Sequence, residues 1–126
     1  MIDQIRAGSL LPSPLFVDFD CDAILDARDS DAAFEQEWLA AWENLGTRWR
    51  ASLPDRAARK AVEDLRRESF LAVSTATGRH ELSSYVSDDF ELIAWASAVG
   101  EVPPLVTWLW ESYAAGAIPR PDRRGT

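Results

Sequence analysis

The most regular pattern of apolar and polar positions lies in the middle of the chain, between Leu53 and Gly78. Apolar or small side chains recur there at steps of three and four residues, which gathers them on one face of a helix. They are Val62, Leu65, Ser69, Ala72, Val73 and Ala76. Pro54 is typical of the first turn of a helix, and Gly78 of the position just past a helix end. The pattern predicts one continuous helix over residues 54–77.

A second helix is predicted over residues 31–45, where aromatic and aliphatic side chains again follow helical spacing. Ser30 is a suitable cap for its start, and Gly46 is expected to end it. Trp38 and Trp42 lie one turn apart in this segment and give it a large contact face. Core packing is the common role of such aromatic groups.

Two more helices are predicted toward the C-terminus, near residues 88–99 and 103–115. Ser87 is a good cap for the first of them, and one or two separate helical turns are expected before it. That helix carries apolar side chains on most sides, so it should lie in the middle of a bundle. Pro103 and Pro104 are expected to open the last helix.

Residues 15–23 show a different pattern, in which apolar and acidic positions alternate with a period of two. Such alternation indicates an extended segment with one buried face. The opposite face carries Asp18, Asp20 and Asp22. A strand needs a partner strand, and no second segment shows the pattern as clearly. We therefore expect a short extended N-terminal segment attached to the bundle.

These elements predict a mainly α fold, a single-domain helical bundle of about four main helices. The domain is expected to cover residues 1–118, and residues 119–126 are expected to form a flexible tail. The chain has 126 residues, of which 47% are hydrophobic. It is therefore large enough to bury a core without metal or disulfide support.

The chain is acidic, and its charge is unevenly distributed. The net charge is −8. Residues 1–46 hold ten acids and two bases, residues 47–80 four acids and eight bases, and residues 81–126 seven acids and three bases. Nucleic acid and an anionic membrane are poor partners for this distribution, since phosphate binding needs clustered Lys and Arg that the fold leaves free. A basic protein surface is the better electrostatic match.

The sequence also predicts the setting in which the protein works. It contains no run of about 18 apolar residues of the kind that spans a bilayer. Its N-terminus lacks the basic start and apolar centre of a secretory signal. Cys21 stands alone, so no intrachain disulfide is expected. A reducing, cytoplasmic setting is the simplest expectation.

One short motif points toward catalysis, namely Val17-Asp18-Phe19-Asp20. It resembles the opening of haloacid-dehalogenase-type phosphohydrolases. In that family an apolar strand delivers a nucleophilic Asp, and a second Asp two residues later acts as acid and base around Mg²⁺. The resemblance implies a phosphate-binding role for Ser74 or Thr75 and a metal-binding role for Asp88 and Asp89.

The sequence departs from that family in three ways. Cys21 and Asp22 replace the Gly-Thr that usually follows the second Asp, and no lysine lies between Thr75 and Asp88. Only about ten residues separate the supposed second and last strands, whereas a parallel crossover needs a dozen or more. A short motif of this kind is a hypothesis that needs its structural context.

Other catalytic and metal sites find little support. His80 is the sole histidine and follows a predicted helix end, where a surface or capping role is common. One histidine and one cysteine give zinc no adequate ligand set. The spacing of Asp18, Asp20, Asp22 and Asp26 does not fit an EF-hand loop. We expect no catalytic residue, no metal site and no cofactor.

The acidic positions and the large aromatic residues are the candidates for partner binding. Asp18, Asp20 and Asp22 repel one another unless positive charge lies opposite. That charge is either internal or a basic partner's. The internal candidates are Arg56, Arg59, Lys60, Arg66 and Arg67. With a partner, the three aspartates would steer the encounter and Trp38, Trp110 or Tyr113 would anchor it, as aromatic groups do at binding hot spots.

The sequence favours a non-enzymatic, acidic protein-binding or regulatory module, for example a bacterial immunity-type inhibitor of a toxin or other basic partner. This is an analogy of physical character, based on size, charge and the missing active site. Two alternatives stay open. One is a Mg²⁺-dependent phosphohydrolase that uses Asp18 and Asp20. The other is a structural homodimer formed through the last helix, whose two apolar stripes offer more surface than one neighbour usually covers.

Overall fold

The structure is a computed structural model that describes residues 2–8, 10–16 and 20–124. These residues form an all-α single domain, 79% helical, with five main helices and no strand among them. The mainly α prediction is therefore confirmed. The main helices are α2 (Cys21–Ser30), α3 (Ala32–Ala51), α4 (Arg56–Thr77), α5 (His80–Val99) and α6 (Pro104–Ala114). Shorter elements are α1 (Ile2–Arg6) and the 3₁₀ turns η1 (Ser13–Phe16) and η2 (Pro121–Arg123).

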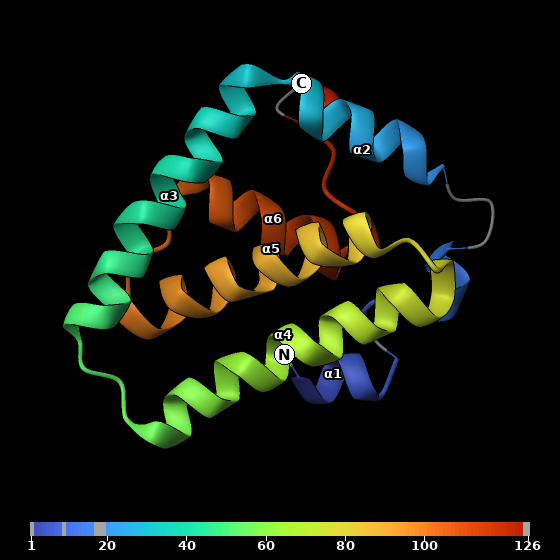
Figure 1. Ribbon diagram of the computed structural model, residues 1–126. Helices are drawn as coiled ribbons and strands as arrows, with labels where there is room; N and C mark the ends of the chain where they lie inside the picture. Colours follow the sequence, from blue (N-terminus) through green and yellow to red (C-terminus); the bar gives the residue numbers. More distant parts are fainter. Residues whose placement is uncertain (1, 9, 17–19, 125–126) are drawn as a thin grey trace.

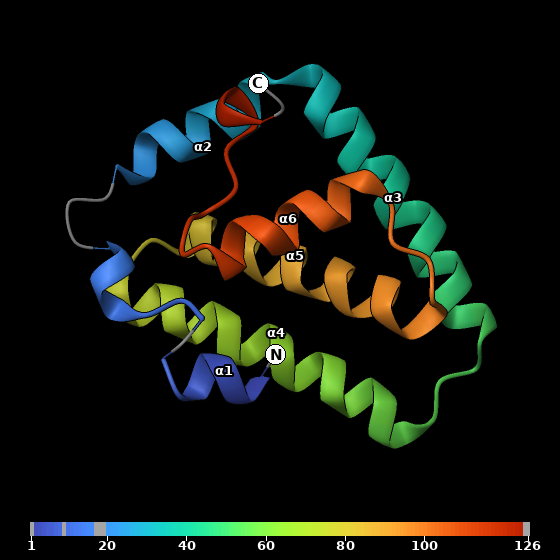
Figure 2. The same cartoon turned by 180° about the vertical axis from the view of Figure 1, so that it is seen from behind.

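Helix α5 occupies the centre of the bundle, as its apolar pattern predicts. It lies between α4 and α6, and α3 crosses it near its C-terminal end (Figures 1 and 2). Ten of its twenty side chains are buried. Helix α1 lies along α4, while α2 packs against α3 and η2 at the side of the bundle. The central helix therefore meets neighbours on several sides, whereas α2 sits at the periphery.

Helix α4 confirms the long helix predicted over residues 54–77. It begins at Arg56, because the carboxylate of Asp55 accepts a hydrogen bond from the backbone N–H of Ala58 (2.8 Å) and so caps the helix. It ends at Gly78, whose φ of 68° is in the left-handed region that favours glycine. The described chain thus enters α5 through a tight turn that sets α4 beside it.

Helix α5 is longer than predicted, because it begins at His80 and runs through Ser87 without a break. The expected cap at Ser87 is wrong. Its hydroxyl donates to the carbonyl oxygen of Ser84, in the preceding turn of the same helix (2.9 Å). Asp89 therefore lies in the middle of α5 and is fully buried. Aspartate favours first turns, but here its tertiary partners decide its place.

The helix predicted over residues 31–45 is present, but both of its expected ends are wrong. Asp31 rather than Ser30 caps α3, accepting a hydrogen bond from the N–H of Phe34 (2.9 Å). The helix continues through Gly46 to Ala51. A Cβ at Gly46 would lie 3.1 Å from a ring carbon of Trp95. This glycine thus allows α3 to approach α5 closely instead of ending the helix.

The extended segment predicted over residues 15–23 is wrong wherever the structure describes it. Leu15 and Phe16 belong to η1, residues 17–19 lie outside the described residues, and α2 begins at Cys21. The carboxylate of Asp20 accepts a hydrogen bond from the N–H of Ala23 (3.0 Å) and caps α2. The buried positions of α2 follow helical spacing, at Cys21, Ile24, Leu25 and Arg28.

The C-terminal segment contacts the body of the protein at its described positions. The guanidinium of Arg124 pairs with Glu37 of α3 (2.6 Å) and lies 5.0 Å from the ring centre of Trp108. The flexibility expected for residues 119–126 stays a prediction. Among the described helices, none is both long and apolar enough to cross a membrane.

Candidate functional site

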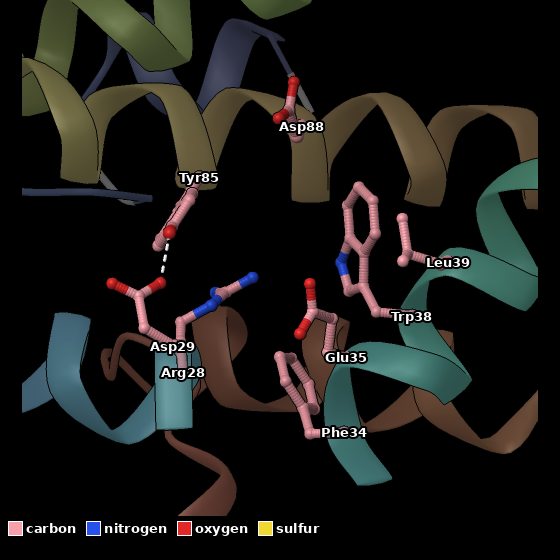
Figure 3. Close-up of a pocket in the computed structure, with 8 residues that line it drawn as sticks. All are labelled: Arg28, Asp29, Phe34, Glu35, Trp38, Leu39, Tyr85 and Asp88. Atoms are coloured by element: carbon pink, nitrogen blue, oxygen red, sulfur yellow. Dashed lines mark hydrogen bonds between the residues drawn. The ribbon is translucent and has the colours of Figure 1, made fainter. Parts of the chain in front are cut away.

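A pocket with a volume of about 190 Å³ lies where α2, α3 and α5 meet. The last turn of α2 contributes Arg28 and Asp29, and α5 contributes Tyr85 and Asp88, one turn apart (Figure 3). The first two turns of α3 contribute the rest of the lining, namely Phe34, Glu35, Trp38 and Leu39. Between the two helices the chain turns at Asp31, whose extended backbone (φ −95°, ψ 94°) ends α2 and begins α3, so the two helices diverge (Figure 1).

Beneath the pocket lies a buried charged network centred on Asp89. The two terminal guanidinium nitrogens of Arg28 donate to its carboxylate, each at 2.7 Å. The indole N–H of Trp38 donates to one carboxylate oxygen (3.0 Å) and the hydroxyl of Tyr113 to the other (2.6 Å). Asp89 therefore accepts four hydrogen bonds from three helices, which satisfies a buried carboxylate.

In this network Arg28 keeps its positive charge and Tyr113 stays protonated. Burial alone would lower the pKa of the Arg28 guanidinium, but the charge and hydrogen bonds of Asp89 raise it above its ordinary value. Burial also raises the pKa of Tyr113, so its hydroxyl keeps the proton that it donates. The rings of Phe34 and Tyr85 each lie 5.3 Å from the guanidinium carbon of Arg28. Arg28 is thus held by a carboxylate and by aromatic rings.

The mouth of the pocket is acidic and partly apolar. Asp29, Glu35 and Leu39 are exposed, while Trp38, Tyr85 and Asp88 are half-buried. The hydroxyl of Tyr85 donates to Asp29, and this bond raises the pKa of Tyr85. The carboxylate of Glu35 points into the space between Trp38 and Arg28 (Figure 3).

Asp88 is only partly neutralised by its own partner. It pairs with Arg66 of α4 (2.9 Å), and the same guanidinium also pairs with Glu91. Burial raises the pKa of Asp88 despite the opposing effect of Arg66. The guanidinium of Arg66 thus pairs with two carboxylates, and partial burial disfavours the ionised form of Asp88.

The acidic site residues predicted from the sequence lie apart from the pocket's floor. Asp18 lies outside the described residues. Asp20 caps α2, and Asp22 is exposed and pairs with Arg79 (2.5 Å). Among the described residues, no ion pair joins α4 to the aspartates of α2. Lys60, Arg66 and Arg67 of α4 pair instead with acids of α4 or α5, as in Lys60–Asp64 (2.9 Å).

The three aromatic candidates are separated by the fold. Trp38 lines the pocket, with one face stacked on Trp42 at 5.1 Å between ring centres. Trp110 is half-buried beside a different groove on α6, together with Val102 and Val106. Tyr113 is only 2% exposed and lies in the core. Of the three, Trp38 alone lines the acidic pocket, where it is half-buried, and the homodimer through α6 stays a prediction.

Sequence reasoning missed Arg28, Glu35, Tyr85 and the burial of Asp89. One signal for Arg28 was available, because it follows Cys21, Ile24 and Leu25 at helical spacing and so belongs to the apolar face of α2. An arginine on such a face requires a buried carboxylate as partner. Nothing local identifies Asp89 as that partner, since it lies 61 positions later in the chain.

The arrangement implied by the phosphohydrolase resemblance is not found. Ser74 and Thr75 lie in α4 and Asp88 and Asp89 in α5, so the parallel strands that would carry these residues are helices. The described residues contain no group of three or more His, Cys, Asp or Glu placed to hold a metal ion. The pocket instead offers aromatic surface and negative charge, which suit the recognition of a positively charged group.

Comparison with known proteins gives one match. A family model described as "Immunity protein PIM1" matches residues 1–120. This range includes α1 to α6 and every residue of the pocket. No curated protein and no solved structure matches the chain.

Proposed function

The chain belongs to the immunity protein PIM1 family, and from this premise we propose that it binds a partner toxin and inhibits it through a protein–protein interface. Immunity proteins bind and inhibit a toxin. The finer part of the proposal is that the toxin presents a basic surface, and that this surface meets α2 and the start of α3. Inhibition then follows from covering the toxin's own functional surface, without chemistry by the inhibitor.

The observation that carries the proposal is the charge of residues 20–37, here called the acidic arm. This segment contains seven carboxylates and one arginine. The carboxylates are Asp20, Asp22, Asp26, Asp29, Asp31, Glu35 and Glu37. Six of them are exposed and Asp31 is half-buried. The arginine, Arg28, is buried and already paired with Asp89. The arm therefore presents an excess of exposed negative charge, which attracts a basic surface.

Local roles account for only part of this charge. Asp22 pairs with Arg79, and Glu37 with Arg124. Asp20 and Asp31 cap helices. A cap needs one oxygen as acceptor and does not remove the negative charge. Exposed like charges oppose folding. Their concentration in this one segment therefore favours a binding role.

The first test is neutralisation of a toxin encoded beside the gene. Cells that produce the toxin should grow only when this protein is also produced, and the two purified proteins should form a complex that titration calorimetry detects. Absence of both rescue and binding would contradict the proposed function.

The second test concerns the basic character of the partner. Replacing Asp18, Asp20 and Asp22 together by asparagine should slow association about three- to tenfold at low ionic strength and less at high salt. Asparagine retains capping at position 20. The matched control, with Asp3→Asn, Glu63→Gln and Glu111→Gln, changes the net charge equally on α1, α4 and α6. Equal slowing in both triple variants would remove the steering role of Asp18, Asp20 and Asp22.

A further inference from the structure

We propose that the pocket between α2, α3 and α5 receives a single arginine side chain of the toxin, whose guanidinium lies against Trp38 and pairs with Glu35. This inference rests on the proposed function, and it names the chemical group that is recognised. It describes short-range recognition in the pocket, whereas the charge of the acidic arm acts through long-range attraction.

The size of the pocket fits a side chain. Its volume is about 190 Å³, whereas about 15 Å³ measured in the same way holds one water molecule. The buried ring of Phe34 and the half-buried rings of Trp38 and Tyr85 form its wall, and the exposed residues Asp29, Glu35 and Leu39 also line it. A planar group on a flexible stem can therefore enter while its backbone stays at the surface.

The charge of the pocket favours a cation. Arg28 brings one positive charge, but Asp89 cancels it. Arg66 brings another, shared between two acids. The pocket residues and their direct ion-pair partners include two arginines and five carboxylates, which gives a net charge of −3. The carboxylates are Asp29, Glu35, Asp88, Asp89 and Glu91. Burial, and to a smaller extent the charge of Asp89, raises the pKa of Asp88, and a further positive charge nearby would favour its ionised form.

Glu35 is the carboxylate best placed to bind the incoming group. It is exposed, and among the described residues it makes no ion pair or side-chain hydrogen bond. Its oxygens point into the pocket beside Trp38 (Figure 3). Asp29, by contrast, already accepts the hydroxyl of Tyr85.

The aromatic wall favours arginine over lysine. Trp42 covers one face of Trp38, so the part of the indole that lines the pocket is its other face and edge. A guanidinium stacks on such a surface and presents a fork of donors to a carboxylate, whereas an ammonium is a compact, strongly hydrated charge. The protein already shows this geometry internally, where Arg28 contacts two rings and a carboxylate at once.

The probe for the test is N-acetyl-arginine amide, titrated into the isotope-labelled protein and followed by the indole N–H signals of its tryptophans. We expect a saturable shift at Trp38, with a dissociation constant in the millimolar range, and no shift at Trp110, which lies beside the other groove. N-acetyl-citrulline amide has nearly the same shape without the charge and should give no saturable shift. N-acetyl-lysine amide should bind more weakly than the arginine probe.

Glu35→Gln should weaken binding of the arginine probe by a factor of about two to five, and the control Glu63→Gln on α4 should leave it unchanged. Both positions are exposed, so neither variant disturbs the core. The inference is overturned if the arginine probe gives no saturable shift at Trp38, or if the citrulline or lysine probe binds equally well. Neutralisation of the toxin by the wild-type protein would still stand in that case, so failure of the inference and failure of the proposed function are distinguishable.

Discussion

Asp88 and Asp89 are neighbours in α5, yet they belong to two regions with different electrostatics. The side chains of Asp89 and its partner Arg28 are 0% and 5% exposed, whereas those of Asp88 and its partner Arg66 are 34% and 36% exposed. The chemistry of the two ion pairs is the same. Solvent screens the outer pair, so its net contribution is small, while the inner pair cannot lose one partner without leaving a buried charge.

This difference separates the carboxylate that holds the fold together from those that solvent reaches. The inner network joins α2, α3, α5 and α6 through one carboxylate, and it fixes the wall of the pocket. The outer carboxylates keep contact with solvent, so a partner can reach them. We infer that the same kind of residue supports the fold at Asp89 and serves recognition one residue away. Each prediction below tests that separation.

The largest effect is expected for Asp89→Asn. The change leaves the guanidinium of Arg28 buried without its counter-charge, so the free energy of unfolding should fall by about 3–5 kcal/mol. Urea denaturation followed by circular dichroism measures this loss. A loss below about 1 kcal/mol, the range of exposed pairs, would show that the two regions do not differ as described.

The next largest effect is expected for Tyr113→Phe, which removes one buried donor from Asp89 but keeps the ring. Hydrogen bonds to charged groups contribute about 1.5–3 kcal/mol, and three donors to Asp89 remain, so we expect a loss of about 1.5 kcal/mol. Tyr85→Phe is the matched control, because its acceptor Asp29 is exposed. Urea denaturation should give a smaller loss for Tyr85→Phe, and equal losses would contradict the role of burial.

Asp88→Asn should change the free energy of unfolding by less than about 1 kcal/mol. Whether the variant is more or less stable than the wild type tests the effect of burial on Asp88. Burial raises the pKa of Asp88 above the ordinary value of 3.8. The folded state therefore holds this proton more tightly than the unfolded state, and the stability it gains is lost as the pH rises through the raised pKa. We expect the variant to equal or slightly exceed the wild type at pH 7. A clear loss there would mean that Asp88 behaves like Asp89.

The smallest effect is expected at Glu37, and its dependence on pH should be opposite to that at Asp88. Its hydrogen bond from Arg124 lowers the pKa of Glu37 below the ordinary value of 4.5. The stabilisation is present above that value and is lost as the pH falls through the lowered pKa. Glu37→Gln, which keeps the contact of Arg124 with the ring of Trp108, should reduce stability near pH 7 by about 0.5 kcal/mol. The difference from the wild type should vanish in acid, as thermal melts at several pH values can measure; a constant difference would argue against the ion pair.

Much of the fold was predictable because it depends on local signals. The α4 helix has a strong apolar face, a proline near its start and a glycine just past its end, and α6 begins with prolines. These signals act within a few residues. The predictions failed where one residue type serves two purposes. Gly46 was expected to end a helix, but it allows close approach to Trp95. Ser87 was expected to begin one, but it lies inside α5.

The candidate site was predictable only in part. The charge of residues 20–37 and the choice of Trp38 come from the sequence and need no coordinates. The pocket depends on the angle between α2 and α3 and on side chains from α5. Those features require contacts between residues about 50 to 60 positions apart, such as Trp38 with Asp89. Sequence spacing alone contains no information about such pairs.

The sequence by itself determined that this protein is a helical, acidic domain with its central helix near the end of the chain. Helical periodicity and net charge are sums over local residues, so they can be counted without a structure. Only the tertiary structure decided which charges are buried and which meet the solvent. That choice sets the role of each carboxylate, because the free energy of an ion pair depends on its surroundings more than on the identity of its two residues.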